Sequence, residues 1–239
     1  MRIFIIGCQY TGLSAAKFWK SRGHFVTVTT TRESRVAELS AQFDKVVVMR
    51  GSDVETMQSI LPEQDAVLMS VAGGMIEKDG KVVLDADAYT DTYLGTAKNI
   101  VEALKNSPSV KHIIFPSSTS AYGDGFSKDS VTEDDKTNPA SIFQTVYVET
   151  ESVLLSAESD TRKVCILRTG NIYGIGRELK TQATATRRER SSISSSPRAR
   201  SGAGLRARRS RSQQATTPSS TATCRTATRR SSRPRARSS

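Results

Sequence analysis

The stretch MRIFIIGCQYTGLSAAKFWKSRG, residues 1–23, decides the fold. It begins with a continuous apolar run, which is typical of a strand that is covered on both faces of a parallel sheet. Leu13, Ala16 and Trp19 then recur at helical spacing, and Gly23 supplies a stop for the helix. A buried strand that turns at a glycine into a helix is the first half of a βαβ unit, so this stretch predicts an α/β protein.

Five further apolar runs follow, and helical segments separate them. The six predicted strands are Arg2–Gly7, His24–Thr30, Lys45–Met49, Ala66–Ser70, Lys111–Pro116 and Lys163–Arg168. Amphipathic patterns predict two longer helices, at Tyr89–Leu104 and Val146–Ser156. Strands that alternate with helices in this way describe a Rossmann-type, doubly wound parallel sheet, which we expect to be incomplete at its C-terminal end.

The composition changes abruptly after residue 180. The chain has 239 residues and a net charge of +11, but residues 181–239 contain 15 arginines and a single acidic residue, so residues 1–180 carry a net charge of −3. The basic segment has too little apolar surface to offset the entropy cost of ordering its backbone. We therefore expect a Rossmann-like domain in residues 1–179 and a disordered, low-complexity tail in residues 180–239.

The turn after the first predicted strand has the spacing of a dinucleotide-binding loop. In GCQYTG, Gly7 fits the first glycine of such a loop and Gly12 the third, whereas Gln9 stands where glycine normally lets a pyrophosphate approach the backbone. We expect the phosphates to bind at the N-terminus of the helix, to Gly7, Gln9, Tyr10, Thr11 and Gly12. The alternative is a strand–helix turn without a ligand.

The second predicted strand ends in TTTRESR, residues 29–35, and this end bears on the choice between NAD and NADP. An NAD site typically places Asp or Glu here, where the carboxylate binds the ribose 2′-hydroxyl. Thr31 and Arg32 instead offer a hydroxyl and a guanidinium, which suit a 2′-phosphate. We therefore expect NADP as the preferred cofactor, with NAD as the second choice. The alternative is that Arg32 and Arg35 are solvated loop charges.

Two further stretches, SSTSAYGD (residues 117–124) and LRTGNIYGIGREL (residues 167–179), complete a pattern with GCQYTG and TTR. In this order and spacing, the four stretches resemble the NAD(P)-dependent epimerase/dehydratase group of extended and atypical short-chain dehydrogenases/reductases, over residues 1–179. The resemblance implies that Ser118 is the catalytic residue that hydrogen-bonds a substrate oxygen. It also implies that four residues border the nicotinamide half of the cofactor: Ser70, Val71, Ala72 and Ser117.

The Tyr-x-x-x-Lys pair that serves this family in acid/base catalysis is replaced. Counting back from Glu151, the tyrosine position falls on Phe143 and the lysine position on Tyr147. Phenylalanine has no proton to give, so Tyr147 is the remaining candidate for a catalytic acid/base, and packing is its alternative role. The resemblance thus implies an NAD(P)-dependent oxidoreductase or epimerase of impaired or absent activity, or a non-catalytic nucleotide-binding scaffold.

In the family, the sequence YGxGR leads into a substrate-binding domain, and nothing that resembles this domain follows residue 179. Lysine disappears at the same point: residues 1–180 contain 12 lysines and residues 181–239 none. We interpret this change as out-of-frame translation or an incorrect gene boundary. The alternative is a genuine arm that binds nucleic acid non-specifically through its charge. The expected partners are a dinucleotide and an unknown small-molecule substrate.

Other features of the sequence exclude several classes of protein. Cys8, Cys165 and Cys224 lack the spacing of metal ligands, so we expect no metal site. The apolar run at the N-terminus is shorter than that of a signal peptide, and no apolar run reaches 18 residues. We therefore expect a cytoplasmic protein that does not bind membranes.

Overall fold

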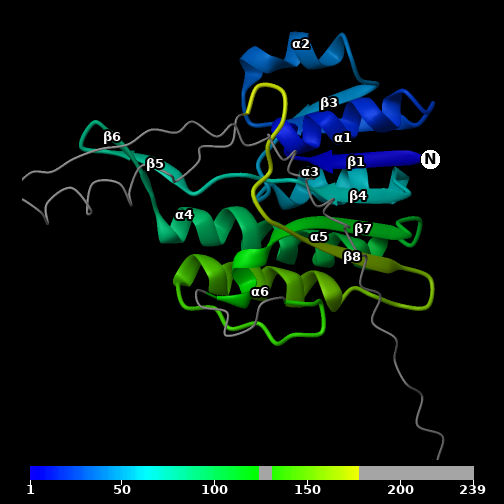
Figure 1. The fold of residues 1–239 in the computed structure, drawn as a ribbon. Coiled ribbons are helices and arrows are strands. Elements are labelled where there is room, and N and C mark those ends of the chain that lie inside the picture. Colours follow the sequence, from blue (N-terminus) through cyan, green and yellow to red (C-terminus); the bar gives the residue numbers. More distant parts are fainter. Residues whose placement is uncertain (124–130, 178–239) are drawn as a thin grey trace, which may run out of the picture. The chain divides into compact units, whose positions relative to one another are not determined.

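The computed structural model describes residues 1–123 and 131–177, and it shows a six-stranded parallel sheet between helices (Figure 1). The strands of this sheet are β1 (Arg2–Ile6), β2 (Phe25–Thr30), β3 (Lys45–Val48), β4 (Ala66–Met69), β7 (His112–Ser118) and β8 (Lys163–Thr169). Their spatial order is β3-β2-β1-β4-β7-β8, so the direction of winding reverses between β1 and β4. The predicted doubly wound fold is confirmed, with strand ends that differ from the prediction by at most two residues.

Six α-helices flank the sheet in the described part of the chain. They are α1 (Tyr10–Lys20), α2 (Val36–Ser40), α3 (Val54–Ile60), α4 (Ala86–Thr90), α5 (Thr96–Ala103) and α6 (Ile142–Leu155). A π-helical turn, Asp91–Gly95, joins α4 to α5, so the predicted helix at Tyr89–Leu104 contains a wide turn. Helix α6 begins four residues before the predicted start, because Ser141 and Gln144 form a capping box there.

Two apolar clusters fill the layers between the sheet and the helices. Successive residues of β1 enter opposite clusters: Ile3 and Ile5 join the residues of α1 and α2, whereas Phe4 and Ile6 join those of α3, α5 and α6. All four side chains are at most 2% exposed. Burial on both faces is the physical reason why this strand reads as a continuous apolar run in the sequence.

A two-stranded antiparallel hairpin lies between β4 and α4 and was not predicted. Its strands are β5 (Met75–Lys78) and β6 (Lys81–Leu84). The turn residues Asp79 and Gly80 both have positive φ, at 52° and 71°. Asp-Gly is a preferred dipeptide for such two-residue hairpin turns, so a hairpin signal is present in the sequence itself.

Residues 171–177 belong to a second compact unit, in which Gly174 and Arg177 exchange two backbone hydrogen bonds. The predicted tail, with any binding of nucleic acid by it, lies outside the described residues. Within residues 1–123 and 131–177, no helix combines the length and the apolar character that a membrane crossing requires.

Gly7 and Gly23 both have positive φ, at 93° and 80°. Their replacement by alanine therefore separates the effect of backbone strain, which both share, from that of steric overlap, which only Gly7 has. A Cβ on Gly7 would lie 2.5 Å from the Ser70 carbonyl oxygen, whereas a Cβ on Gly23 would meet nothing within 4 Å. We predict that Gly23→Ala lowers the free energy of unfolding by about 1–2 kcal/mol through backbone strain alone. Gly7→Ala should cost roughly 1–3 kcal/mol more, because backbone must move. Urea unfolding followed by circular dichroism measures both losses, and equal losses would contradict the prediction.

Candidate functional site

A cavity of about 360 Å³ lies at the carboxyl edge of the sheet. Its walls come from the segments that follow the first four strands of the sheet, 7–9, 31–35, 49–52 and 71–76, and from the helical region that contains Asp91 and Thr96. In doubly wound sheets, ligands bind outside the carboxyl ends of the strands, where the winding reverses. The cavity lies at this reversal, because segments 7–9 and 71–76 follow β1 and β4.

The loop from β1 to α1 is shaped to receive an anion. Gly7 donates its N–H to Oγ1 of Thr29 at 2.9 Å, and a Cβ on Gly12 would overlap the carbonyl oxygen of Gly7. Helix α1 begins after Gln9, whose side chain does not cap it, and its first turn contains no acidic residue. The Gln9 side chain therefore leaves this turn without an N-cap, and the helix dipole favours negative charge there. These residues fit a phosphate group.

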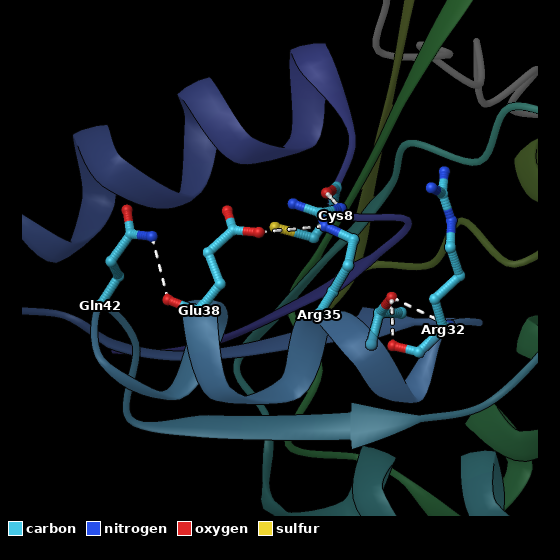
Figure 2. A network of polar contacts seen from close by, with 6 residues as sticks. Cys8, Arg32, Arg35, Glu38 and Gln42 are labelled. Atoms are coloured by element: carbon cyan, nitrogen blue, oxygen red, sulfur yellow. Dashed lines mark hydrogen bonds and ion pairs between the residues drawn. The ribbon is translucent and has the colours of Figure 1, made fainter.

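Arg35 links the segment after β2 to this loop. Its Nη1 atom donates to the carbonyl oxygen of Cys8 at 2.7 Å, and its Nε atom lies 3.5 Å from Oε2 of Glu38 (Figure 2). The guanidinium of Arg32, by contrast, extends away from these contacts in Figure 2. It makes no hydrogen bond or ion pair with any residue that the structure describes. Arg35 is thus a structural contact of the loop rather than a solvated charge, whereas Arg32 lines the cavity with its charge unpaired by any described residue.

Cys8 lies in the same loop and lines the cavity, with 1% of its surface exposed. Burial raises the pKa of its thiol to about 11, against the opposing effect of the Arg35 charge. The thiol is therefore protonated and unreactive at neutral pH. Within the described residues, no three His, Cys, Asp or Glu side chains are grouped so that they could hold a metal ion.

The structure brings about half of the predicted cofactor residues to the cavity. Those that line it are Gly7, Gln9, Thr31, Arg32, Val71 and Ala72. Those outside the lining are Tyr10, Thr11, Gly12, Ser70 and Ser117. Of these, Tyr10 and Thr11 contribute backbone of the first turn of α1, and Gly12 packs against Gly7.

The sequence analysis missed the segment after β3, where Arg50, Gly51 and Ser52 line the cavity. Helix α5 fixes this segment: Nδ2 of Asn99 donates to the Gly51 carbonyl oxygen at 2.8 Å, and a Cβ on Gly51 would overlap the side chain of Thr96. Gly51 itself was the available signal in the sequence. It stands two residues after the predicted strand Lys45–Met49, and a glycine at a strand end often marks a close approach of two backbones.

Ser117 and Ser118 end strand β7 with different partners. The Ser118 hydroxyl accepts a hydrogen bond from the Ser120 N–H at 3.1 Å and keeps its own proton to donate. The Ser117 hydroxyl is buried and donates to Oε1 of Glu151 at 2.5 Å. Arg168 of β8 binds the same carboxylate through Nε and Nη2, with the shortest contact at 2.6 Å. Its hydrogen bonds to Glu151 raise the pKa of Arg168.

Phe143 and Tyr147, to which the resemblance assigns the positions of the catalytic pair, belong to an aromatic cluster. The ring centroids of Tyr89 and Phe143 lie 5.1 Å apart, and so do those of Tyr93 and Tyr147. Burial raises the pKa values of Tyr89 and Tyr93, and hydrogen bonding with Tyr147 raises them further. Tyr147 therefore has neutral hydroxyl groups beside it. This geometry shows a packing role for Tyr147, and its catalytic role stays a prediction.

Comparison with known proteins places the chain in a family. The sequence model of the NAD dependent epimerase/dehydratase family matches residues 3–195. The match extends past residue 179, where the resemblance in motifs ends. A search among curated proteins finds no significant match.

Solved structures with the same fold include enzyme WbmH of Bordetella bronchiseptica in complex with NAD⁺, at 21% identity and a TM-score of 0.60 over 74% of this chain and 58% of that one. UDP-glucose 4-epimerase of Thermotoga maritima with UDP-glucose has 21% identity and a TM-score of 0.60, over 73% of this chain and 57% of that one. A short-chain dehydrogenase/reductase superfamily protein of Agrobacterium tumefaciens with bound NAD has 19% identity and a TM-score of 0.58, over 70% of this chain and 48% of that one. The chain thus spans about half the length of these structures.

The buried pair of Glu151 and Arg168 yields a test of stability, because their side chains are only 4% and 18% exposed. We predict that Glu151→Leu lowers the free energy of unfolding by about 3–5 kcal/mol, since it leaves the guanidinium without its partner. The double variant Glu151→Leu/Arg168→Met should regain part of this loss. Denaturant unfolding of the four proteins completes a double-mutant cycle, and strictly additive losses would mean that the two side chains are not coupled.

Proposed function

The chain belongs to the NAD-dependent epimerase/dehydratase family, and on this basis we propose that it binds NADP in preference to NAD in the cavity at the carboxyl edge of the sheet. Two observations together carry the proposal. The Gln9 side chain does not cap the first turn of α1, and Arg32, whose guanidinium has no partner among the described residues, lines the same cavity. One feature suits a pyrophosphate and the other a 2′-phosphate.

Each part of the cavity would hold one part of the cofactor. The turn at Gly7 and Gln9, with the first N–H groups of α1, would bind the pyrophosphate. Thr31 and Arg32 would bind the 2′-phosphate through a hydroxyl and a guanidinium. Val71 and Ala72 would border the nicotinamide half. When bound, the nicotinamide supplies hydride chemistry, and the protein contributes binding and orientation.

We propose that acid/base catalysis is impaired, although Ser118 can still donate a hydrogen bond to a substrate oxygen. Phe143 has no proton to transfer, and Tyr147 has no cation four residues further along α6, where Glu151 stands. A second candidate function is a non-catalytic nucleotide-binding scaffold. It is supported by Phe143, which has no proton to transfer, and by Glu151, which stands where a cation would be needed. We propose cofactor binding, in the cytoplasm, as the function of this chain.

Titration with NADPH and NADH, followed by nicotinamide fluorescence, tests the cofactor proposal. We predict that the full chain binds NADPH at least about tenfold more tightly than NADH, which corresponds to one charge-assisted contact. Gln9→Gly should strengthen the binding of both by a common factor, because the pyrophosphate is common to both. A chain that circular dichroism shows to be folded and that binds neither nucleotide would contradict the proposal.

Restoring the missing pair tests whether the catalytic end of the site is intact. We predict that the tyrosine introduced by Phe143→Tyr ionises about one pH unit lower when Tyr147→Lys is also present, because an ammonium group one helical turn away favours the phenolate. Absorbance at 295 nm follows this ionisation as a difference from matched controls that lack the introduced tyrosine: the unmutated chain for Phe143→Tyr, and Tyr147→Lys for the double variant. The other tyrosines are common to each pair and cancel in the difference. Identical titration curves for the single and double variants would show that the two positions do not communicate.

A further inference from the structure

Strand register places a second arginine beside Arg32. In the parallel pair β2–β3, Thr30 lies opposite Val48. Arg32 follows Thr30 by two residues, and Arg50 follows Val48 by two residues. Since parallel strands point the same way, both arginines leave the sheet at the same edge and at the same distance beyond it. Both also line the cavity.

Neither of these two guanidinium groups is neutralised by a residue that the structure describes. No hydrogen bond or ion pair between described residues uses the side chain of Arg32 or Arg50. Arg35, the third arginine of the cavity, is already engaged with Cys8 and Glu38. Two guanidinium groups that line one cavity and have no counter-ion among the described residues favour an anion whose charge exceeds one, because each can donate hydrogen bonds to it.

The backbone that carries Arg50 is held in place on both sides. Before it, Met49 is 5% exposed and donates its N–H to the Thr30 carbonyl oxygen at 2.9 Å. After it, Gly51 accepts the hydrogen bond from Asn99. A charged side chain on a fixed backbone loses less entropy when a ligand binds, so Arg50 is better placed for recognition than an arginine on a free loop.

We propose that Arg50 acts together with Arg32 as a clamp for a phosphate monoester on the adenosine ribose, and that Arg50 thereby determines specificity for NADP over NAD. This inference rests on the proposed function, in which the cavity binds a nicotinamide dinucleotide. A 2′-phosphate is dianionic near neutral pH and offers three acceptor oxygens, enough for two guanidinium groups. The 2′-hydroxyl of NAD carries no charge and leaves both groups without a partner.

Coenzyme fragments isolate this contact from the rest of the site. We would measure the dissociation constants of adenosine 2′,5′-bisphosphate and of 5′-AMP by calorimetry, and those of NADPH and NADH by fluorescence, at 150 mM salt. The proteins are the full chain, Arg50→Gln, Arg50→Lys and Arg32→Gln. Arg22→Gln is the matched control, because it removes the same charge from an arginine that stacks on Phe18 outside the cavity. The control also accounts for attraction by the basic C-terminal segment, which all five proteins share.

Arg50→Gln should weaken the bisphosphate and NADPH about ten- to a hundredfold while it changes 5′-AMP and NADH less than about twofold. Arg50→Lys should keep part of the preference, since it retains the charge without the planar fork. Arg22→Gln should change none of the four constants. The clamp is overturned if Arg50→Gln weakens NADPH and NADH equally, or if only Arg32→Gln affects NADPH. If the unmutated chain binds neither coenzyme, or binds both equally, the proposed preference for NADP fails together with the clamp. If the unmutated chain prefers NADPH and Arg50→Gln keeps that preference, the clamp alone is overturned.

Discussion

The close approach of Gly7 to the backbone after β4 is the constraint on which the rest of the site depends. Only a hydrogen atom fits there, because a larger group would meet the Ser70 carbonyl oxygen at 2.5 Å. This contact draws the end of β1 against the end of β4, the two strands between which the winding reverses. Gly12 then lets α1 pack directly on the turn. The N-terminus of a helix and the segment after β4 thus become two walls of one cavity.

The central strands, which the sequence predicted, are those that burial on both faces stabilises. Phe4 and Ile5 enter different apolar clusters, and a strand of this kind is visible as an uninterrupted apolar run. The β5–β6 hairpin was missed because burial does not stabilise it: Val82, for example, is 67% exposed. Its determinants are the turn at Asp79 and the pairing of two short strands, which leave a weaker pattern in a single sequence.

The predictable part of the site is local in sequence, and the rest depends on contacts between distant segments. The loop from Gly7 to Gly12 could be predicted because its strand, turn and helix follow one another directly. The position of Arg50 beside Arg32 depends on the register of β2 and β3, which the sequence alone does not specify. The commitment of the Ser117 hydroxyl to Glu151, 34 residues further on, depends likewise on how α6 packs against β7.

The two ends of the site therefore differ in how their charges are used. Near β2 and β3, Arg32 and Arg50 have no counter-ion among the described residues and can attract an anionic ligand. Near β7 and β8, Arg168 is already paired with the buried Glu151, so its charge serves the packing of α6 against the sheet. These two sets share no residue and lie on different strands. Because they are separate, the lack of a hydroxyl at Phe143 leaves the wall formed by Arg32 and Arg50 unchanged, so the proposed nucleotide site does not depend on the proposed loss of acid/base catalysis.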